Sequence, residues 1–412
     1  MSEHVALVPL HRNRAFLTFW GLGALNSTGR WLETLVFAIF VFDQTGSPFL
    51  VASMLMLRLL PMAMFGIFGG IVADRLNRYT ILRLASALVT IVALTLYLFA
   101  INGILEVWHI GVASFLSGLV WSTDFPVRRT LMSDLAGPAR VSRAMSLDIL
   151  AGSVTRTLGP ILGGILYQQI GIEGAFLLGG CLYAAGLILI AMTKRQTETS
   201  TAAQRSVLDD IRHGLAILRD HEFLPGMLVV TIIFNVWGYP FISMVPVIAK
   251  DFLDLSDAAT GFLTSAEGAG ALLGAIALSI LAKSEHSRYF YTLAVLTYCV
   301  FAFSFSLSNT LWLSATLLVI VGLVSAAFGA MQSALVLLNS PAGYQRQMMG
   351  VLSVCIGTAP IGFLHIGFLA DQFGATTACT ITAIEGVLAM TIAIWRWPTL
   401  LKSQPTHQGS TV

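Results

Sequence analysis

The sequence predicts an all-α membrane protein in which twelve transmembrane helices form two pseudo-symmetric six-helix bundles. Two observations predict this fold class. Apolar residues make up 56% of the chain and charged residues only 11%, which is far from the composition of a soluble domain. Residues 138–175 also recur without a gap at 341–378, with the same residue at turns such as Gly171 and Gly374. A long internal repeat in a membrane chain indicates two related halves.

Twelve apolar stretches account for the predicted helices, since a helix needs about 20 apolar residues to cross the hydrocarbon. They are 16–42, 49–72, 79–101, 107–126, 143–167, 173–193, 223–249, 258–282, 289–308, 311–337, 348–370 and 375–395. The apolar runs are continuous and not alternating, which favours helices over barrel strands. The first stretch is too long for the core of a signal peptide, so it is counted as a span.

The domain organisation follows from the gap between the sixth and seventh stretches. Residues 1–193 are predicted to form the first bundle and residues 223–397 the second, followed by a tail at 398–412. The segment 194–222 is polar at first and then carries apolar residues at helical spacing. We therefore expect a cytoplasmic linker with an amphipathic helix on the membrane surface.

The distribution of basic residues predicts the orientation. Of the 23 Lys and Arg residues, Lys250 alone falls in an outer loop if both termini lie inside. Arg30, Arg58 and Arg156 fall within spans, and all the others lie in inner loops and tails. This bias places both termini in the cytoplasm and the chain in the inner cell membrane.

Several functional classes are excluded by what the sequence lacks. The four cysteines lie in apolar stretches without a CxxC or Cys/His cluster, so neither disulfides nor a metal site is expected. There is no phosphate-binding G-x-x-x-x-G-K-[ST] loop and no HExxH or GxSxG motif. No basic stripe suggests nucleic acid. We therefore expect neither an enzyme nor a cofactor.

The loop after the second stretch reads Gly69-Gly70-Ile-Val-Ala-Asp74-Arg75-Leu-Asn77-Arg78. It resembles the G-x-x-x-D-R-x-G-R-R loop of the major facilitator superfamily, with Gly70, Asp74, Arg75 and Arg78 in matching positions. Asn77 stands where the second glycine is usual, and Asn tolerates positive φ. The resemblance implies that this loop controls opening on the cytoplasmic side. The alternative is an ordinary basic loop beside packed glycines.

The fifth stretch contains Gly159-Pro160-Ile-Leu-Gly163-Gly164. It resembles the G-P-x-x-G-G element of antiporters in the same superfamily. Proline removes one backbone hydrogen bond, and the glycines let a neighbouring helix approach closely. These four residues are therefore predicted to act in the conformational change. A kinked, tightly packed helix without directional meaning is the alternative.

The segments Asp124-Phe-Pro126-Val-Arg128-Arg129 and Arg143-Ala-Met-Ser-Leu147 resemble the drug and siderophore exporter branch, which includes enterobactin-exporter-like and macrolide-efflux proteins. Arg128 is predicted to act in gating, the opening and closing of the transport path.

One departure from the family pattern concerns the fourth stretch, where many proton-coupled antiporters have R-x-x-x-G. Here Ser114 precedes Gly118, which leaves proton coupling by that route in question.

Charged residues within spans are costly, about 2.5–3.5 kcal/mol each on insertion scales, so they normally face a cavity or a partner. The candidate substrate-binding and coupling residues are Asn26, Arg30, Glu33, Arg58, Asp124, Arg156, Asn235 and Glu267. The superfamily architecture implies that five of them converge on one central site. They are Arg30, Glu33, Arg58, Arg156 and Glu267.

The alternative for these charges is a set of structural ion pairs, such as Arg30–Glu33 or Asp124–Arg128. Asp148 is expected to pair with Arg143. His365 and Glu385 are interpreted as structural. Aromatic residues on several spans suit an amphipathic ligand but are also ordinary packing residues.

The predicted function is secondary active export of a small hydrophobic or amphipathic molecule, drug-like or siderophore-like, by alternating access. Glu33 and Glu267 are the expected carriers of a coupling proton, and Arg30, Arg58 and Arg156 the expected substrate anchors. The expected partners are a small-molecule substrate, protons and membrane lipids, and the protein is expected to be a monomer. Uptake by a symporter, lipid flipping and a non-transporting receptor or scaffold remain as alternatives.

Overall fold

A computed structural model describes residues 10–65, 77–137, 140–193, 218, 221–281, 287–341 and 344–402. The described residues form helices joined by short turns. Ten helices, the first of them Arg78–Ile101, are long and apolar enough to cross a membrane. Two further helices precede them. The first carries Arg30 and Glu33, and the second has a shorter apolar part, Pro48–Met64. Together they make the twelve helices that the sequence predicts.

The helices have the following bounds. The first bundle comprises α1 (Arg14–Thr45), α2 (Pro48–Phe65), α4 (Arg78–Ile101), α5 (Val107–Ala136), α6 (Val141–Ile170) and α7 (Ile172–Ala191). Span 7 consists of α9 (Leu224–Ile233), η3 (Phe234–Gly238), η4 (Tyr239–Met244) and α10 (Val245–Asp251). The remaining elements are α11 (Asp257–Leu281), α12 (Ser287–Ser306), α13 (Leu311–Asn339), α14 (Gln345–Ile356), α15 (Ala359–Phe373) and α16 (Ala375–Arg396). Short 3₁₀ turns, η1 (Leu10–Arg12) and η6 (Pro398–Leu401), stand at the two ends.

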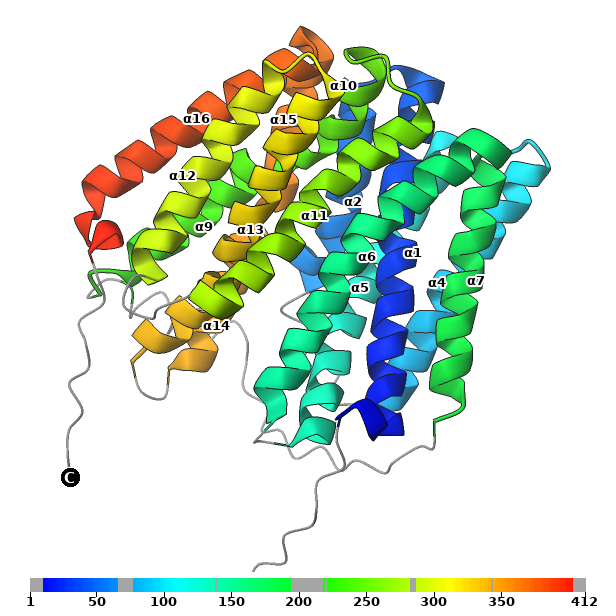
Figure 1. Ribbon diagram of the computed structural model, residues 1–412, viewed down its shortest axis with the longest axis horizontal. Coiled ribbons are helices and arrows are strands. Elements are labelled where there is room, and N and C mark those ends of the chain that lie inside the picture. Colours follow the sequence, from blue (N-terminus) through cyan, green and yellow to red (C-terminus); the bar gives the residue numbers. More distant parts are fainter. Residues whose placement is uncertain are drawn as a thin grey trace, which may run out of the picture.

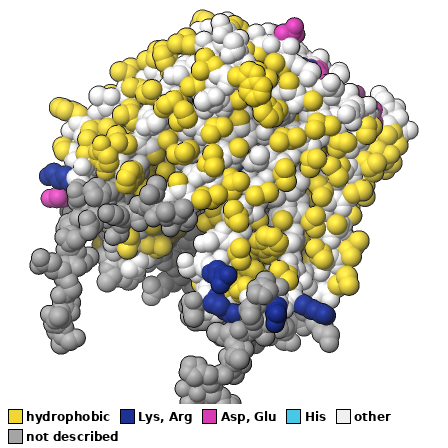
Figure 2. All heavy atoms as spheres, viewed as in Figure 1, with side chains coloured by type: hydrophobic (Ala, Val, Ile, Leu, Met, Phe, Trp, Pro, Cys, Tyr) yellow, Lys and Arg dark blue, Asp and Glu magenta, His cyan; other side chains and the backbone are white. Residues whose placement is uncertain are grey.

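The two bundles lean together at one end and diverge towards the other (Figure 1). They meet along two helix pairs, α6 with α11 and α2 with α15. The end at which they meet is where α1 ends and α10 lies. At the opposite end, where α1 begins, Lys and Arg side chains gather along the edge of a mostly apolar surface (Figure 2).

The internal repeat corresponds to a shared backbone path. Its two copies cover the fifth and eleventh spans and the turn into the next helix. At that turn, Gly171 has φ 92° and Gly374 has φ 85°. Both values lie in the region that favours glycine, because a Cβ there is strained. The identical glycines of the repeat therefore end equivalent helices and start equivalent partners.

Two of the expected continuous helices are interrupted. Span 7 changes to a π-helix at Phe234–Gly238 and then to a 3₁₀-helix at Tyr239–Met244. Pro240 has no N–H to donate to the helix, so a regular α-helical ladder cannot continue through it. Span 11 is divided between α14 and α15, close to Pro360. The spans predicted at 223–249 and 348–370 are both present, as Leu224–Asp251 and Gln347–Phe373.

Polar contacts join the bundles at the end where they meet. Lys250 Nζ lies 3.4 Å from Asp43 Oδ1 of α1 and 2.6 Å from Asp257 Oδ1 of α11. Ser47 Oγ donates to Asp371 Oδ1 over 2.9 Å. The backbone N–H of Ala258 donates to Gln168 Oε1 over 3.0 Å. These contacts hold the first bundle against the second on the side that the charge bias assigns to the outside.

Replacing Lys250 with glutamine should weaken this closure. The Lys250 and Asp43 side chains are 22% and 33% exposed, so water screens their ion pair, which is worth about 1 kcal/mol at most. We expect a shift of up to about fivefold towards conformations open at this end. Spin labels at the outer ends of α2 and α15 would show it as a new, longer distance component. A Lys402→Gln variant is the control, and equal distance distributions in the two variants would contradict the prediction.

Candidate substrate and coupling site

A pocket lies between the two bundles and is lined by residues of both. Its walls include Trp31 and Thr34 of α1, Arg156 of α6, Tyr239 of span 7 and Glu267 of α11. The empty space is about 510 Å³, including the part that is open to solvent. Aromatic walls with a few charged groups are typical of small-molecule sites. The pocket is therefore a candidate small-molecule site.

An ion pair crosses this pocket from one bundle to the other. Arg156 Nη2 lies 2.6 Å from Glu267 Oε1. The side chain of Glu267 is 3% exposed and that of Arg156 is 20% exposed. The Arg156 guanidinium also lies over the Trp31 ring, 4.9 Å from its centre, where a cation–π interaction contributes to its position. Because one partner belongs to each bundle, any movement of α6 away from α11 must break this pair.

A second ion pair lies within the first bundle. Arg58 Nη2 of α2 is 3.3 Å from Glu33 Oε2 of α1, and both side chains are buried. Arg58 also donates to the Arg30 carbonyl over 3.0 Å and to the Thr34 hydroxyl. Thr34 lines the central pocket. The Glu33–Arg58 pair therefore stands directly behind the pocket wall.

A second pocket is lined by helices of the first bundle. Asn26, Arg30, Ser117, Asp124 and Tyr183 line it. Its empty space is about 290 Å³. The Arg30 guanidinium lies over the Trp121 ring, 5.0 Å from its centre. Arg156 and Glu267 thus meet at the bundle interface, whereas Arg30 lines the pocket of the first bundle. Convergence of Arg30, Glu33, Arg58, Arg156 and Glu267 on one site stays a prediction.

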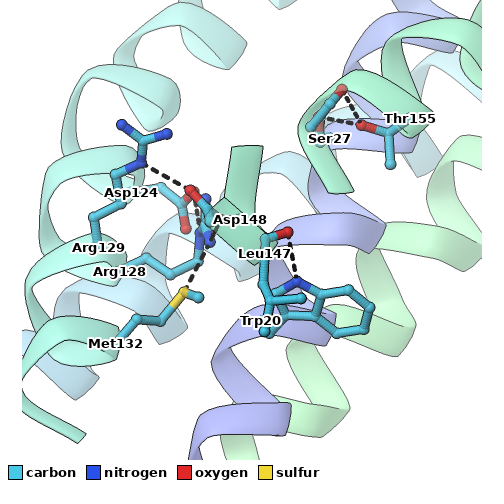
Figure 3. Close-up of polar contacts among 10 residues, drawn as sticks. Trp20, Ser27, Asp124, Arg128, Arg129, Met132, Leu147, Asp148 and Thr155 are labelled. Carbon is cyan, nitrogen blue, oxygen red and sulfur yellow. Dashed lines mark hydrogen bonds and ion pairs between the residues drawn. The ribbon is translucent and has the colours of Figure 1, made fainter. Parts of the chain in front are cut away.

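A cluster of four charged residues joins α5 to α6 beside the second pocket, whose lining includes Asp124 (Figure 3). Arg128 Nη1 lies 2.6 Å from Asp148 Oδ1, and Arg129 Nε lies 2.8 Å from Asp148 Oδ2. Arg128 Nε is 3.9 Å from Asp124 Oδ2. The expected pairing of Asp148 with Arg143 was wrong, since residues five apart on a helix point to different faces and Arg143 is exposed.

The alternative of ion pairs within one helix holds in part. Asp124 and Arg128 form an i,i+4 pair, although it is long. Glu33 pairs with Arg58 of the neighbouring helix and not with Arg30. His365 Nε2 lies 2.7 Å from Glu385 Oε2, which also accepts from Trp237 Nε1 over 3.0 Å. This joins spans 7, 11 and 12 within the second bundle, as expected of structural residues.

Comparison with known proteins identifies the family. Residues 4–405 match the family model described as transmembrane secretion effector, within the major facilitator superfamily. The chain belongs to this family. It is 24% identical over 382 residues to the MFS-type transporter YfiS of Bacillus subtilis (strain 168), covering 90% of each chain.

Two further relatives have names that describe what they transport. Macrolide efflux protein A of Streptococcus pyogenes is 19% identical over 389 residues, which cover 92% of this chain and 94% of the relative. The staphyloferrin A transporter of Staphylococcus aureus is 19% identical over 379 residues, which cover 90% and 93%. Among solved structures, the peptide transporter POT in complex with sulfate superposes with a TM-score of 0.76 at 13% identity, over 96% of this chain and 97% of that one. The major facilitator fold and the resemblance are thereby confirmed.

The antiporter-like element of this family member divides its glycines between two neighbours. A Cβ on Gly159 would lie 2.6 Å from Trp31 Cβ, and one on Gly163 would lie 3.2 Å from the Leu32 carbonyl oxygen, both on α1. A Cβ on Gly164 would lie 3.0 Å from Gly261 Cα of α11. Pro160 lines the central pocket. One face of α6 thus packs within its own bundle, while Gly164 makes the close contact with the other bundle.

The superfamily loop lies largely outside the described residues, which include neither Gly70 nor Asp74 nor Arg75. The linker at 194–222, with its expected amphipathic helix, is described only at Leu218 and from His221 onwards. Arg78 Nη1 lies 3.0 Å from Asp134 Oδ2 of α5. Asn77, at the position of the usual glycine, caps α4 by accepting a hydrogen bond from the Tyr79 N–H over 3.0 Å. The departure from the family pattern therefore has a local structural role.

The structure differs from the sequence-based site at two residues, one that was predicted and one that was not. Asn235 donates to the Thr231 carbonyl over 2.9 Å, within span 7. It lies in the π-helical turn and is not in the described lining of either pocket. Tyr183, by contrast, lines the second pocket and was missed. Its signal was a lone tyrosine among the small and aliphatic residues of the sixth stretch.

Proposed function

We propose that this transporter exports a small hydrophobic or amphipathic molecule by alternating access, in exchange for protons. The Arg156–Glu267 ion pair carries the proposal, because it links the bundles at the wall of the central pocket. Efflux by a relative named macrolide efflux protein A and transport of staphyloferrin A by another support the direction and the class of substrate.

The coupling step follows from the chemistry of the pair. Substrate that binds Arg156 from the cytoplasm displaces Glu267, so the attraction between α6 and α11 falls. The first bundle can then rock against the second, opening the end closed by Lys250. There the substrate leaves and a proton from outside binds Glu267. The protonated protein returns to the conformation open to the cytoplasm, where release of the proton restores the Arg156–Glu267 pair. Residues 1–193 and 223–397 are the two units that move.

The pocket lining suits an amphipathic substrate. Trp31 and Tyr239 offer aromatic surface, which binds flat apolar groups. Arg156, once released from Glu267, can bind a carboxylate or another anionic group. Substrate and proton would then compete for the same ion pair, which is the linkage that antiport requires. Glu33 and Arg58 lie behind Thr34 and can adjust that wall.

The orientation supports export. We propose that both termini lie in the cytoplasm of the cell that holds this protein in its inner membrane, and that the closed end faces outwards. Basic side chains gather at the end where α1 begins (Figure 2), as the positive-inside pattern requires. The conformation is then one that receives substrate from the cytoplasm. One chain contains both bundles and the pocket, so a monomer suffices.

Proteoliposomes with an imposed pH gradient test the proposal. Thermal-shift screening against macrolides, siderophores and lipids selects the radiolabelled probe. Protease digestion of the exposed tail shows which way the protein is inserted, so the direction of flux can be assigned. We expect substrate to move from the cytoplasmic face outwards as protons move inwards. Movement of both in the same direction would indicate a symporter, and exchange of labelled lipid between leaflets without probe flux would indicate a flippase.

A further inference from the structure

Asp124 is a buried carboxylate with few hydrogen-bond or ion-pair partners among the described residues. It lies on α5, is 3% exposed, and its Oδ1 atom has no hydrogen-bond partner among the described residues. The nearest cation to Oδ2 is Arg128 Nε at 3.9 Å, too far for a hydrogen bond. Arg128 directs its Nη1 group to Asp148 instead, over 2.6 Å. An ionised carboxylate left in this state is costly.

The pocket beside Asp124 contains another polar atom without a partner. Asn26 and Ser117 both line the pocket, and among the described residues the buried Asn26 Oδ1 accepts no hydrogen bond. Buried polar atoms are almost always satisfied, by protein or by ordered water. The pocket has room for a water molecule between these polar atoms. The lining therefore fits ordered water.

We infer that Asp124 carries a proton in this conformation, and that the pocket inside the first bundle is a hydrated proton site separate from the central pocket. The inference deepens the proposed antiport and rests on it for its purpose. Glu33 and Glu267 contact arginines at 3.3 and 2.6 Å, so their charges are compensated. Among the described residues of the first bundle, Asp124 is the buried carboxylate whose cation is out of hydrogen-bond range.

The charged and titratable groups around Asp124 are consistent with a site that exchanges its proton. Arg30 faces it from α1, Arg128 from its own helix, Asp148 from α6 and Tyr183 from α7. The two arginines can stabilise the ionised form after the proton leaves, while Asp148 opposes it. A proton released from Asp124 would pass to pocket water.

The arginine arrangement connects this site to the bundle interface. Once Asp124 is ionised, it competes with Asp148 for Arg128 (Figure 3). Asp148 keeps a partner in that exchange, because Arg129 contacts its other oxygen at 2.8 Å. Asp148 and Arg156 lie two turns apart on α6. A change in the contacts between α5 and Asp148 therefore affects α6, the helix that carries Arg156 of the inter-bundle ion pair.

Infrared difference spectroscopy of the purified protein in lipid nanodiscs tests the inference directly. A protonated carboxyl group has a C=O stretch that an ionised one lacks. We expect such a band at neutral pH in the wild type, its loss in Asp124→Asn, and its return at a shifted frequency in Asp124→Glu. Asp134→Asn, on the same helix but with a 61% exposed side chain, is the matched control and should keep the band.

The water in the pocket has its own readout. In D₂O the Asp124 band should shift within minutes, because pocket water exchanges the carboxyl hydrogen. Absence of the band at neutral pH, or its survival in Asp124→Asn, would overturn the inference. A wild-type protein with the band but without pH-driven flux would overturn proton antiport and leave this site intact. Conversely, pH-driven flux without the infrared band would leave proton antiport intact and overturn the proton site at Asp124.

Discussion

Replacing Glu267 with glutamine is expected to abolish pH-driven transport, with a loss of about a hundredfold or more, while the protein remains folded. Glutamine has nearly the same shape and can still meet Arg156 and the Ser325 hydroxyl, which lies 3.4 Å from Glu267 Oε1. It cannot bind or release a proton. The measurement is flux into proteoliposomes with and without a pH gradient, alongside the melting temperature.

Truncating Arg156, the partner of Glu267, is a poorer test of proton coupling by this ion pair. Arg156→Ala leaves Glu267 buried without its cation, which costs about 3–5 kcal/mol, so lost activity would be confounded with lost stability. Exchanging the charges, with Arg156→Glu and Glu267→Arg together, restores the pair but moves the carboxylate to the other bundle. Recovery of stability without recovery of coupling would show that the position of the carboxylate matters. Unchanged pH-driven flux in Glu267→Gln would refute the assignment.

The fold could be predicted from the sequence because its determinants are local or repeated. Apolar stretches of membrane length give helices, and the glycines at 171 and 374 have the positive φ that a shared turn needs. The repeat then implies that both halves follow one path. The break in span 7 had a visible cause in Pro240, but the sequence does not show that a π-helical turn precedes it.

The grouping of the charges could not be predicted in the same way. Spacing along one helix places Asn26, Arg30 and Glu33 on one face, but it does not show which neighbouring helix supplies the partner. Glu33 turned out to pair with α2 and Glu267 with α6. Those partners depend on helix packing over long sequence separations. The second pocket likewise needed Tyr183 of α7, which no spacing argument connects to Asp124.

Replacing Gly164 with leucine is expected to hold the protein open at its outer end and stop transport. Gly164 lies where α6 crosses α11, and its added Cβ would meet Gly261 Cα at 3.0 Å and the Asp257 carbonyl oxygen more closely still. Backbone atoms cannot move aside as a flexible side chain can, so the two helices must separate. Separation at this crossing would also pull apart Lys250, Asp257 and Asp43.

The matched control lies twelve residues earlier on the same helix. A Cβ on Gly152 would have nothing within 4 Å, so Gly152→Leu makes the same chemical change in open space. Replacing a helical glycine should even stabilise α6 by up to about 1 kcal/mol. Spin-label distances between the outer ends of α2 and α15 should lengthen in Gly164→Leu and stay unchanged in Gly152→Leu. If both variants transport at the wild-type rate, close approach of α6 to α11 is not part of the cycle, and the inter-bundle ion pair loses its role as a coupling element.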